Sequence, residues 1–504
     1  MGLAARPLKG LFRSTSVYLS GEIGAQGLNV LKYKVLALRL GPEGIGLFSL
    51  VDSFFQLLIV GSSNGVANGS VQLIGSTTAT SRDPAEVRRE SGRIAAAGLT
   101  LVGLIAGMLM LVLWFAGPLV VSVFLDPTAR PYFPIYLLAF PLLCFVPLLN
   151  ALLQAQLRIR EMALARLLGA AADALVIAGL VLLFALKGWF IGLVLSASAS
   201  LLILVAILVR LRAYEFRRFS IGQQSVRRLL VFFFQISIVL TAVGVGSTYI
   251  LRRLTLDHLG IGAVGLYQSA LSFMGYLGLV SRASAVYFFP SIARAETDAQ
   301  RRDELSGWTT LNLAPVIFGA IVLVLFGDLA VRAFFSGRFD GLQPELSWFM
   351  LAEVFVVVTM GYQHMAVALP IMRTHILLCL AIHIGGLVIA VLLMPALGFR
   401  ALGVASCAGS AIGLATYHAA LRRRIGHRFR GSTLLLLGIA IVAVPVAGRL
   451  AVETVLLRVA FLSVVTFAIY RAIDAETRQR VTLKWRDVRK LVTAAGRRGL
   501  RGGR

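Results

Sequence analysis

The chain has 504 residues, of which 58% are hydrophobic and only 14% are charged, and its mean hydropathy is +0.84. Soluble domains carry about 25% charged residues, so this composition excludes a string of ordinary soluble domains. The net charge of +26 would suit a nucleic-acid-binding protein, but the basic residues stand beside apolar runs, where they orient helices and meet anionic lipid. We therefore expect a polytopic membrane protein without a nucleic-acid partner.

Long apolar runs recur along the chain, and each can cross a hydrocarbon layer of about 30 Å as a helix. They predict an all-α fold with about 14 transmembrane helices. In chain order, the predicted spans are 14–40, 43–72, 94–117, 132–157, 163–186, 188–210, 227–251, 262–290, 307–326, 344–371, 375–395, 400–421, 432–449 and 451–470. The first two spans are unusually polar, which indicates that they face water or sugar rather than lipid.

The distribution of basic residues predicts the orientation. With the N-terminus inside, the cytoplasmic segments hold 36 of the 49 Lys and Arg residues, the outside connections hold 9, and 4 lie within spans. This split follows the positive-inside rule and places both termini in the cytoplasm. Arg252 and Arg253 run against the trend at the outer end of the seventh span, and we interpret them as a second anchor.

The chain contains an internal repeat. Residues 39–58 and 258–277 align without gaps at an offset of 219, with 7 of 20 positions identical, including the glycine pairs Gly41/Gly260 and Gly46/Gly265. Both copies form an outside turn that leads into an even-numbered span, so the repeat is parallel. It predicts two six-helix lobes related by an axis along the membrane normal, with a substrate site between them. The glycines suit tight turns and close helix approach, or serve packing alone.

The repeat and the charge runs together predict the domain organisation. The predicted parts are a six-helix lobe at 1–210, a basic cytoplasmic linker at 211–226, a second six-helix lobe at 227–421, an extra helix pair at 432–470 and a basic cytoplasmic tail at 471–504. Within the tail, residues 473–495 form either a basic surface helix or a solvated segment.

Several kinds of catalytic motif are missing from the sequence. It has no Gly-Lys dipeptide, hence no phosphate-binding loop of the GxxxxGK[ST] type, and no HExxH motif. The six histidines form no ligand-spaced set with carboxylates. The longest outside loop has about 17 residues, too few for an extracytoplasmic catalytic domain. We expect a protein that is not an enzyme and needs neither cofactor nor metal.

Ionisable residues inside the predicted spans are the candidate site, because a charge at bilayer depth is costly unless it faces protein or a water-filled cavity. The substrate-cavity candidates are Glu22, Lys32, Lys34, Asp52, Asp173, Arg282 and Glu353. A carboxylate among them can carry a coupling proton or help to bind a cation, and Lys32, Lys34 or Arg282 can pair with an anionic substrate group. The alternative is that these residues form buried structural pairs between helices.

Several stretches carry a family resemblance. LRLGPEGIGLFSLVDSF, followed by SNGVANGSVQLIG from Ser63, resembles the start of bacterial O-antigen and polysaccharide translocases, in the multidrug/oligosaccharidyl-lipid/polysaccharide flippase superfamily. GAVGLYQSALSFMGYL is similar to the eighth span of that family. KGWFIGLVLS from Lys187 and LGFRALGVAS from Leu397 resemble its outside turns before spans 6 and 12.

The resemblance implies a flippase in the bacterial inner membrane. It would move a polyprenyl-pyrophosphate-linked oligosaccharide, such as an O-antigen or another surface polysaccharide unit, from the inner to the outer leaflet by alternating access. An ion gradient would drive it, which gives an acidic residue such as Asp52 a role. Candidate partners are the lipid-linked oligosaccharide, membrane lipids, a polysaccharide polymerase and glycosyltransferases.

Three other functions remain open. An ion-coupled multidrug exporter of the same superfamily would have a neutral or acidic cavity. A membrane enzyme of polysaccharide assembly usually needs a large outside loop, which the short loops disfavour. A scaffold that does not transport would bind its partners through the basic tail.

Overall fold

The structure is a computed structural model that describes residues 5–80, 83–156, 158–211, 214, 223–234, 244–295, 297–369 and 371–473. Every regular element in these ranges is a helix, which confirms the predicted all-α fold. Most of the predicted linker at 211–226 and nearly all of the basic tail at 471–504 lie outside the described residues.

Ten of the described helical segments are long and apolar enough to cross a membrane. A helix satisfies all of its own backbone hydrogen bonds, so apolar runs of this length fold as helices in a bilayer. Two of the ten, Ser20–Thr77 and Arg160–Leu211, each contain two predicted spans. The protein is therefore a multi-pass membrane protein, while the count of fourteen spans stays a prediction.

The chain divides into two compact units. Unit 1 comprises Met1–Ser272, Leu329–Gln343 and Cys379–Ala405, and unit 2 comprises Phe273–Asp328, Pro344–Leu378 and Ser406–Arg504. The helices that begin in unit 1 are α1 (Ala5–Ile59), the π-helix η1 (Val60–Asn64), α2 (Gly65–Thr80), α3 (Pro84–Phe124), η2 (Pro127–Ala129), α4 (Phe133–Ala155), α5 (Ile159–Leu211), α6 (Gln223–Phe232), α8 (Gly246–Leu259), α9 (Ile261–Leu277), η5 (Gly337–Glu345) and α15 (Arg400–Ile425). The predicted lobe boundaries stay a prediction.

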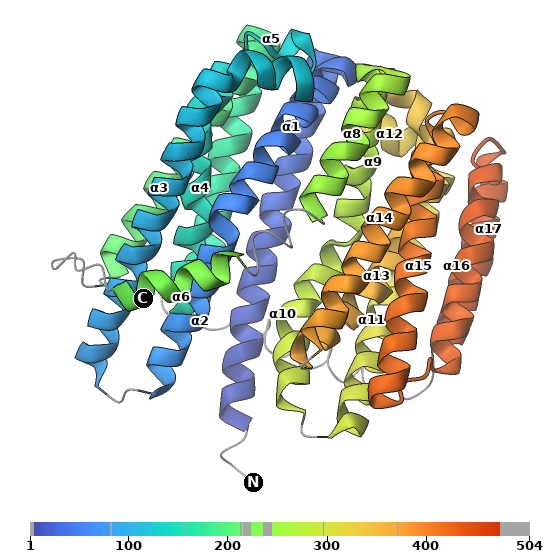
Figure 1. Cartoon of the computed structure of the whole chain (residues 1–504). Coiled ribbons are helices and arrows are strands. Elements are labelled where there is room, and N and C mark those ends of the chain that lie inside the picture. The colour runs from blue at the N-terminus through green and yellow to red at the C-terminus, as the bar shows by residue number, and fades with distance from the viewer. Residues whose placement is uncertain are drawn as a thin grey trace, which may run out of the picture. The chain divides into compact units, whose positions relative to one another are not determined.

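The helices that begin in unit 2 include those of the predicted C-terminal pair. They are α10 (Leu279–Arg294), α11 (Asp298–Leu325), α12 (Gly327–Phe334), α13 (Leu346–Ala368), α14 (Met372–Leu397), α16 (Gly431–Leu450) and α17 (Val455–Ala472). Helix α11 contacts α13 and α16, and α16 contacts α17 (Figure 1).

Two backbone positions with positive φ lie in the internal repeat, and two others precede later predicted spans. Gly41 (φ 68°, ψ −172°) kinks α1, and its repeat partner Gly260 (φ 84°, ψ 171°) follows α8 in the same conformation. Ala185 (φ 48°) kinks α5 before the predicted sixth span, and Gly398 (φ 54°) precedes the predicted twelfth. Positive φ favours glycine, so Ala185 is the strained member of the set. The shared turn geometry supports a parallel repeat.

The second glycine pair of the repeat forms a backbone contact within unit 1. A Cβ atom on Gly46 would collide with the carbonyl oxygen of Ile261 and lie 3.0 Å from the backbone nitrogen of Gly265. A Cβ atom on Gly265 would collide in turn with the carbonyl oxygen of Pro42. The two copies therefore pack against each other at a point where only glycine fits, as expected for close helix approach.

Aromatic side chains hold the helices of unit 1 together. Phe48 of α1 stacks on Trp189 of α5 with ring centroids 3.6 Å apart, and Phe55 of α1 stacks on Tyr136 of α4 at 4.1 Å. Stacked rings bury a large apolar area and fix its geometry. Helix α1 contacts α5, and α2, α3 and α4 contact one another (Figure 1). This packing positions the polar side chains of α1 against α4 and α5.

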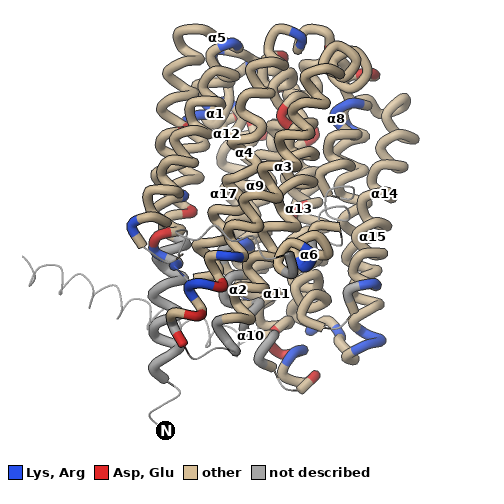
Figure 2. The backbone as a smooth tube through the Cα atoms, turned by 60° about the vertical axis from the view of Figure 1, so that its left-hand side comes forward, with Lys and Arg blue, Asp and Glu red and all other residues tan. Residues whose placement is uncertain are grey.

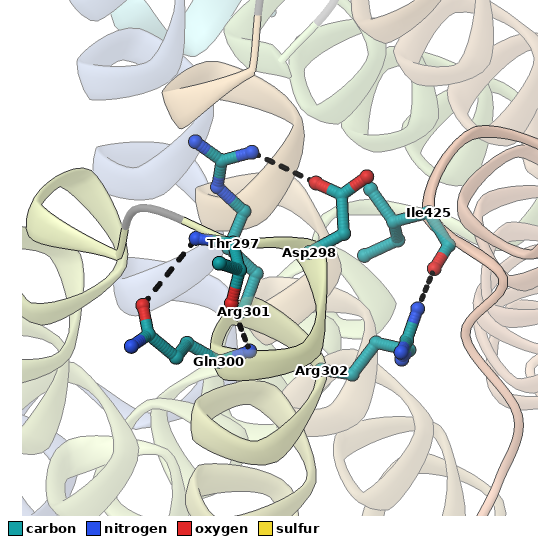
Figure 3. A network of polar contacts seen from close by, with 6 residues as sticks. All are labelled: Thr297, Asp298, Gln300, Arg301, Arg302 and Ile425. Carbon is teal, nitrogen blue, oxygen red and sulfur yellow. Dashed lines mark hydrogen bonds and ion pairs between the residues drawn. The ribbon is translucent and has the colours of Figure 1, made fainter.

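Polar contacts fix the start of α11 in unit 2. Thr297 and Gln300 form a capping box, in which each side chain accepts from the other's backbone N–H (Figure 3). Arg301 pairs with Asp298 at 2.8 Å, and Arg302 donates to the carbonyl oxygen of Ile425 at 2.6 Å (Figure 3). The last contact ties α11 to the C-terminal end of α15.

Charged residues are distributed as a membrane protein requires. Figure 2 shows the helices free of charge over most of their length, with Lys, Arg, Asp and Glu mainly near helix ends. The few charges away from the ends are therefore the ones that need an explanation.

Candidate functional site

The seven predicted cavity residues fall in both units. Five of them, Glu22, Lys32, Lys34, Asp52 and Asp173, lie in unit 1, and Arg282 and Glu353 lie in unit 2. Each group is built differently, so each is described by itself.

Lys32 and Asp173 form an ion pair that joins α1 to α5. The side chains are only 11% and 25% exposed, so each charge is largely withdrawn from water and depends on the other. The ring of Tyr33 lies 5.4 Å from the Lys32 ammonium group. Lys32, which the sequence offered as a partner for an anionic substrate, is thus neutralised by a carboxylate of the protein.

A second ion pair joins the same two helices. Nε of Arg166 lies 2.5 Å from Oε2 of Glu22, and its Nη2 donates to Oε1 at 2.9 Å, a two-pronged contact. Glu22 is 17% exposed, whereas Arg166 is 55% exposed. The sequence places Arg166 among the positive charges of a predicted cytoplasmic segment, not among the predicted site residues. Its position about two turns before Asp173 puts both on the same face of one helix, and this spacing was the available signal.

Asp52 is surrounded by four polar partners from three helices of unit 1. The hydroxyl of Tyr136 donates to its carboxylate at 2.6 Å, and Gln56 also hydrogen-bonds it. Arg252 of α8 and Lys32 of α1 are both close enough to interact with it electrostatically. Asp52 therefore has both hydrogen-bond partners, Tyr136 and Gln56, and electrostatic partners, Arg252 and Lys32.

Arg252 corrects the sequence interpretation of an outside anchor. It is only 8% exposed, it donates to Oε1 of Gln268, and its charge acts on Asp52 and Tyr33. Its neighbour Arg253 fits the anchor better, because it is partly exposed and donates to the carbonyl oxygen of Leu125 at 3.0 Å. The break in the positive-inside trend was the sequence signal that pointed to this buried arginine.

Lys34 has a local structural contact. Its ammonium group donates to the backbone carbonyl oxygen of Arg332, and the nearby Ser336 hydroxyl donates to that of Ala37 at 3.5 Å. Both bonds hold residues 329–343 against α1 within unit 1. The structure does not bring Lys34 together with the carboxylates of the site.

A cavity of about 300 Å³ lies between α1, α4 and α5 in unit 1. Two of the predicted residues, Glu22 and Asp173, line it together with Arg166. The other polar lining residues are amides and hydroxyls: Gln26, Asn29, Asn150, Ser196 and Ser200. The remaining lining is alanine, glycine, leucine and valine. The polar cavity brings together residues that lie far apart in the sequence.

Arg282 and Glu353 meet at a tight corner of unit 2. A Cβ atom on Gly278 would collide with Oε1 of Glu353 and lie 3.1 Å from Nη1 of Arg282. Glu353 of α13 is 5% exposed, whereas Arg282 of α10 is exposed and donates to the carbonyl oxygen of Gly275. The charges of the two residues interact. Among the three candidate cations, all of them described residues, Arg282 is the one with an exposed side chain.

Comparison with solved structures places the fold. The structure is similar to a lipid II flippase MurJ in an inward closed conformation, with a TM-score of 0.71 and 14% identity over 91% of this chain and 98% of that one. It is similar to an inward-facing multidrug resistance MATE transporter of the MOP superfamily, with a TM-score of 0.67 and 15% identity over 82% of this chain and 98% of that one. A MOP superfamily transporter from Pyrococcus furiosus matches with a TM-score of 0.62 and 17% identity over 83% and 96%.

Sequence comparison gives the family. No curated protein matches the sequence. The family model described as polysaccharide biosynthesis protein matches residues 11–296, which is more than half of the chain. The match confirms the resemblance carried by the motifs in the first two spans and indicates a transporter rather than an enzyme. With this match and the shared helical fold, the chain belongs to the polysaccharide biosynthesis protein family.

Proposed function

We propose that the protein flips a polyprenyl-pyrophosphate-linked oligosaccharide from the inner to the outer leaflet of the bacterial inner membrane, by alternating access. The proposal rests on the family and, within the molecule, above all on Arg282. This residue is exposed although it lies inside the predicted eighth span.

An exposed arginine at that depth can face either lipid or water. Facing lipid would cost several kcal/mol, and its charge is not withdrawn into the protein as the charge of Arg252 is. A water-filled path is the environment that fits an exposed guanidinium. Its planar set of donors suits the oxygens of a diphosphate, and the buried Glu353 beside it holds the side chain in place.

The substrate class follows from physics and family together. A diphosphate and a sugar cannot cross about 30 Å of hydrocarbon unaided. A polar path between repeats that rock against each other can shield the headgroup while the lipid tail stays in the bilayer. The likeness in fold to a lipid II flippase supports a lipid-linked precursor as substrate.

Asp52 is our candidate for ion coupling. It can exchange its hydrogen bond from Tyr136 and its interactions with Arg252 and Lys32 for a bound proton or cation. Such an exchange would change the forces between α1, α4 and α8, which is how an ion gradient can bias a conformational equilibrium. Both termini would lie in the cytoplasm, and a polymerase and glycosyltransferases would act beside the protein.

A multidrug exporter is the second candidate, because several structures of similar fold are MATE transporters. One observation favours it: the charges lining the unit 1 cavity are balanced by the protein itself. The exposed Arg282 of unit 2 favours an anionic substrate instead.

Reconstitution in liposomes tests the proposal. Fluorescent polyprenyl-pyrophosphate oligosaccharide is placed in one leaflet, and headgroup accessibility on the other side is followed with and without protein. We expect protein-dependent flipping. If only cationic drugs move and the lipid-linked oligosaccharide does not, the exporter reading replaces ours.

A further inference from the structure

We infer that the unit 1 cavity between α1, α4 and α5 binds one uncharged sugar residue of the transported headgroup. This inference rests on the proposed function and names the part of the substrate that this cavity takes. The diphosphate would be bound elsewhere, by the exposed guanidinium of Arg282.

The charge balance of the cavity excludes charged ligands. Its two carboxylates, Glu22 and Asp173, already have cationic partners in Arg166 and Lys32. An anionic ligand would lie beside these carboxylates and be repelled. A cationic ligand would have to displace an ammonium or guanidinium group that is already in place. A neutral polar ligand disturbs neither ion pair.

The hydrogen-bonding groups of the cavity suit a polyhydroxylated ring. Three amides and two hydroxyls from three helices line it. One N–H of Asn150 donates to the carbonyl oxygen of Val146 at 3.0 Å, which uses one of the four hydrogen-bonding positions of an amide side chain. Gln26 and Asn29 share one long hydrogen bond of 3.5 Å. These groups can exchange such bonds for those of sugar hydroxyls.

The two ion pairs add acceptors to this set. A carboxylate has room for about four hydrogen bonds, and Glu22 accepts one from Nη2 of Arg166, while its Oε2 lies 2.5 Å from Nε of Arg166. Neighbouring hydroxyls of a sugar can donate to the remaining positions. The small apolar side chains between the polar groups, such as Ala170 and Ala197, can contact the C–H groups of the ring.

The size of the cavity limits the ligand to one ring. Its volume of about 300 Å³ stands at the lower end of the range for small-molecule sites, roughly 300 to 1,000 Å³. That fits one monosaccharide unit and not a whole oligosaccharide. The cavity would therefore read the identity of one sugar, while the rest of the headgroup lies in a wider space.

Equilibrium binding tests this inference apart from transport. Purified full-length protein in nanodiscs is titrated with a neutral hexose, an N-acetylhexosamine and a hexuronic acid, with saturation-transfer NMR as the readout. The test variant is Ala170→Leu, which fills the cavity. Its matched control is Ala172→Leu, the same change two residues along α5 at a partly buried position outside the lining.

We expect at least one neutral sugar to bind, and hexuronic acid to bind at least tenfold more weakly. We expect Ala170→Leu to weaken sugar binding at least tenfold and Ala172→Leu to leave it within a factor of two. Binding of no neutral sugar, stronger binding of hexuronic acid, or wild-type binding by Ala170→Leu would overturn the inference. Loss of the fold in Ala170→Leu is checked by its melting curve, and Asn150→Ala then replaces it with the same expectation.

The two proposals can fail separately. If neutral sugar binds but wild-type protein does not flip the lipid-linked oligosaccharide, the flippase proposal falls and the sugar site stands. If flipping occurs while no neutral sugar binds, the sugar site falls and the flippase proposal stands.

Discussion

In unit 1, charged side chains meet opposite charges across helices, Lys32 with Asp173 and Glu22 with Arg166. In unit 2, the carboxylate of Glu353 is buried while the guanidinium of Arg282 is exposed. A charge that is matched inside the protein holds helices together, whereas a charge that is left exposed at bilayer depth is available to a ligand. This difference separates the charged residues that we expect to stabilise the fold from those that we expect to bind substrate.

The largest effect on transport should come from removing the exposed cation of unit 2. Arg282→Ala should lower the flipping rate roughly 100-fold, about 2.7 kcal/mol, while the protein level stays normal, because the side chain is exposed rather than packed in the core. Arg332→Gln is the control: that arginine is also exposed, but it pairs with Asp340 at 2.9 Å, and its loss should leave flipping unchanged. Wild-type flipping by Arg282→Ala would remove this residue from the path.

The next effect should come from breaking the more buried pair of unit 1. Lys32→Ala leaves Asp173 with an uncompensated charge and should lower the free energy of unfolding by about 3 kcal/mol, measured by melting of the purified protein. The double variant Lys32→Leu with Asp173→Leu should recover most of that loss. Lys34→Ala, two residues along and bonded only to a carbonyl oxygen, is the control. Equal losses in Lys32→Ala and Lys34→Ala would contradict a special role for the pair.

His427 should give unit 2 a pH-dependent stability. Burial, and then the positive charges of His418, Arg302 and Arg430, lower the pKa of His427 from 6.5 to about 4 in the loop between α15 and α16. A lowered pKa means that the folded state binds the proton less well than the unfolded chain. The stability is therefore complete above pH 6.5 and is lost as the pH falls from there toward 4.

At pH 5 this loss should reach about 2 kcal/mol, seen as faster hydrogen exchange in residues 425–431. His427→Gln should flatten the dependence, and His258→Gln, which changes an exposed histidine of unit 1, should not. A pH profile that stays the same in His427→Gln would refute the assignment.

Substitutions of Asp52 test whether the charged residues of unit 1 serve only to stabilise the fold. Asp52→Ala should slow flipping about tenfold while the protein level stays normal, because we assign ion coupling to this carboxylate. Asp52→Asn keeps the shape and the bond with Tyr136 but cannot change charge, so it should also lose the response of flipping to an imposed ion gradient. If Asp52→Asn keeps that response, the coupling residue lies elsewhere.

The smallest effect should come from the more exposed pair of unit 1. Arg166 is 55% exposed, so solvent screens its attraction to Glu22. Arg166→Ala should therefore cost about 0.5 kcal/mol, far less than Lys32→Ala by the same melting assay. A loss as large as that of Lys32→Ala would show that exposure does not rank these pairs.

The sequence predicted the local features of the fold and few of the contacts. The kinks at Gly41 and Ala185 fall at the predicted ends of the first and fifth spans, because breaks in an apolar run are local. The pairing of Lys32 with Asp173 joins residues 141 positions apart, and no local pattern selects that partner. The burial of Arg252 was missed for the same reason: its environment is supplied by Asp52, Tyr33 and Gln268.

The contact between Gly46 and Gly265 also constrains how the sequence can change. If the two copies arose by duplication, they would normally diverge independently. Here a side chain added to either glycine would collide with the backbone around the other. A substitution at one glycine therefore cannot be compensated by a substitution at the other. At this crossing the two copies must keep the same residue, so it is where we would look first for traces of an ancestral half-length chain.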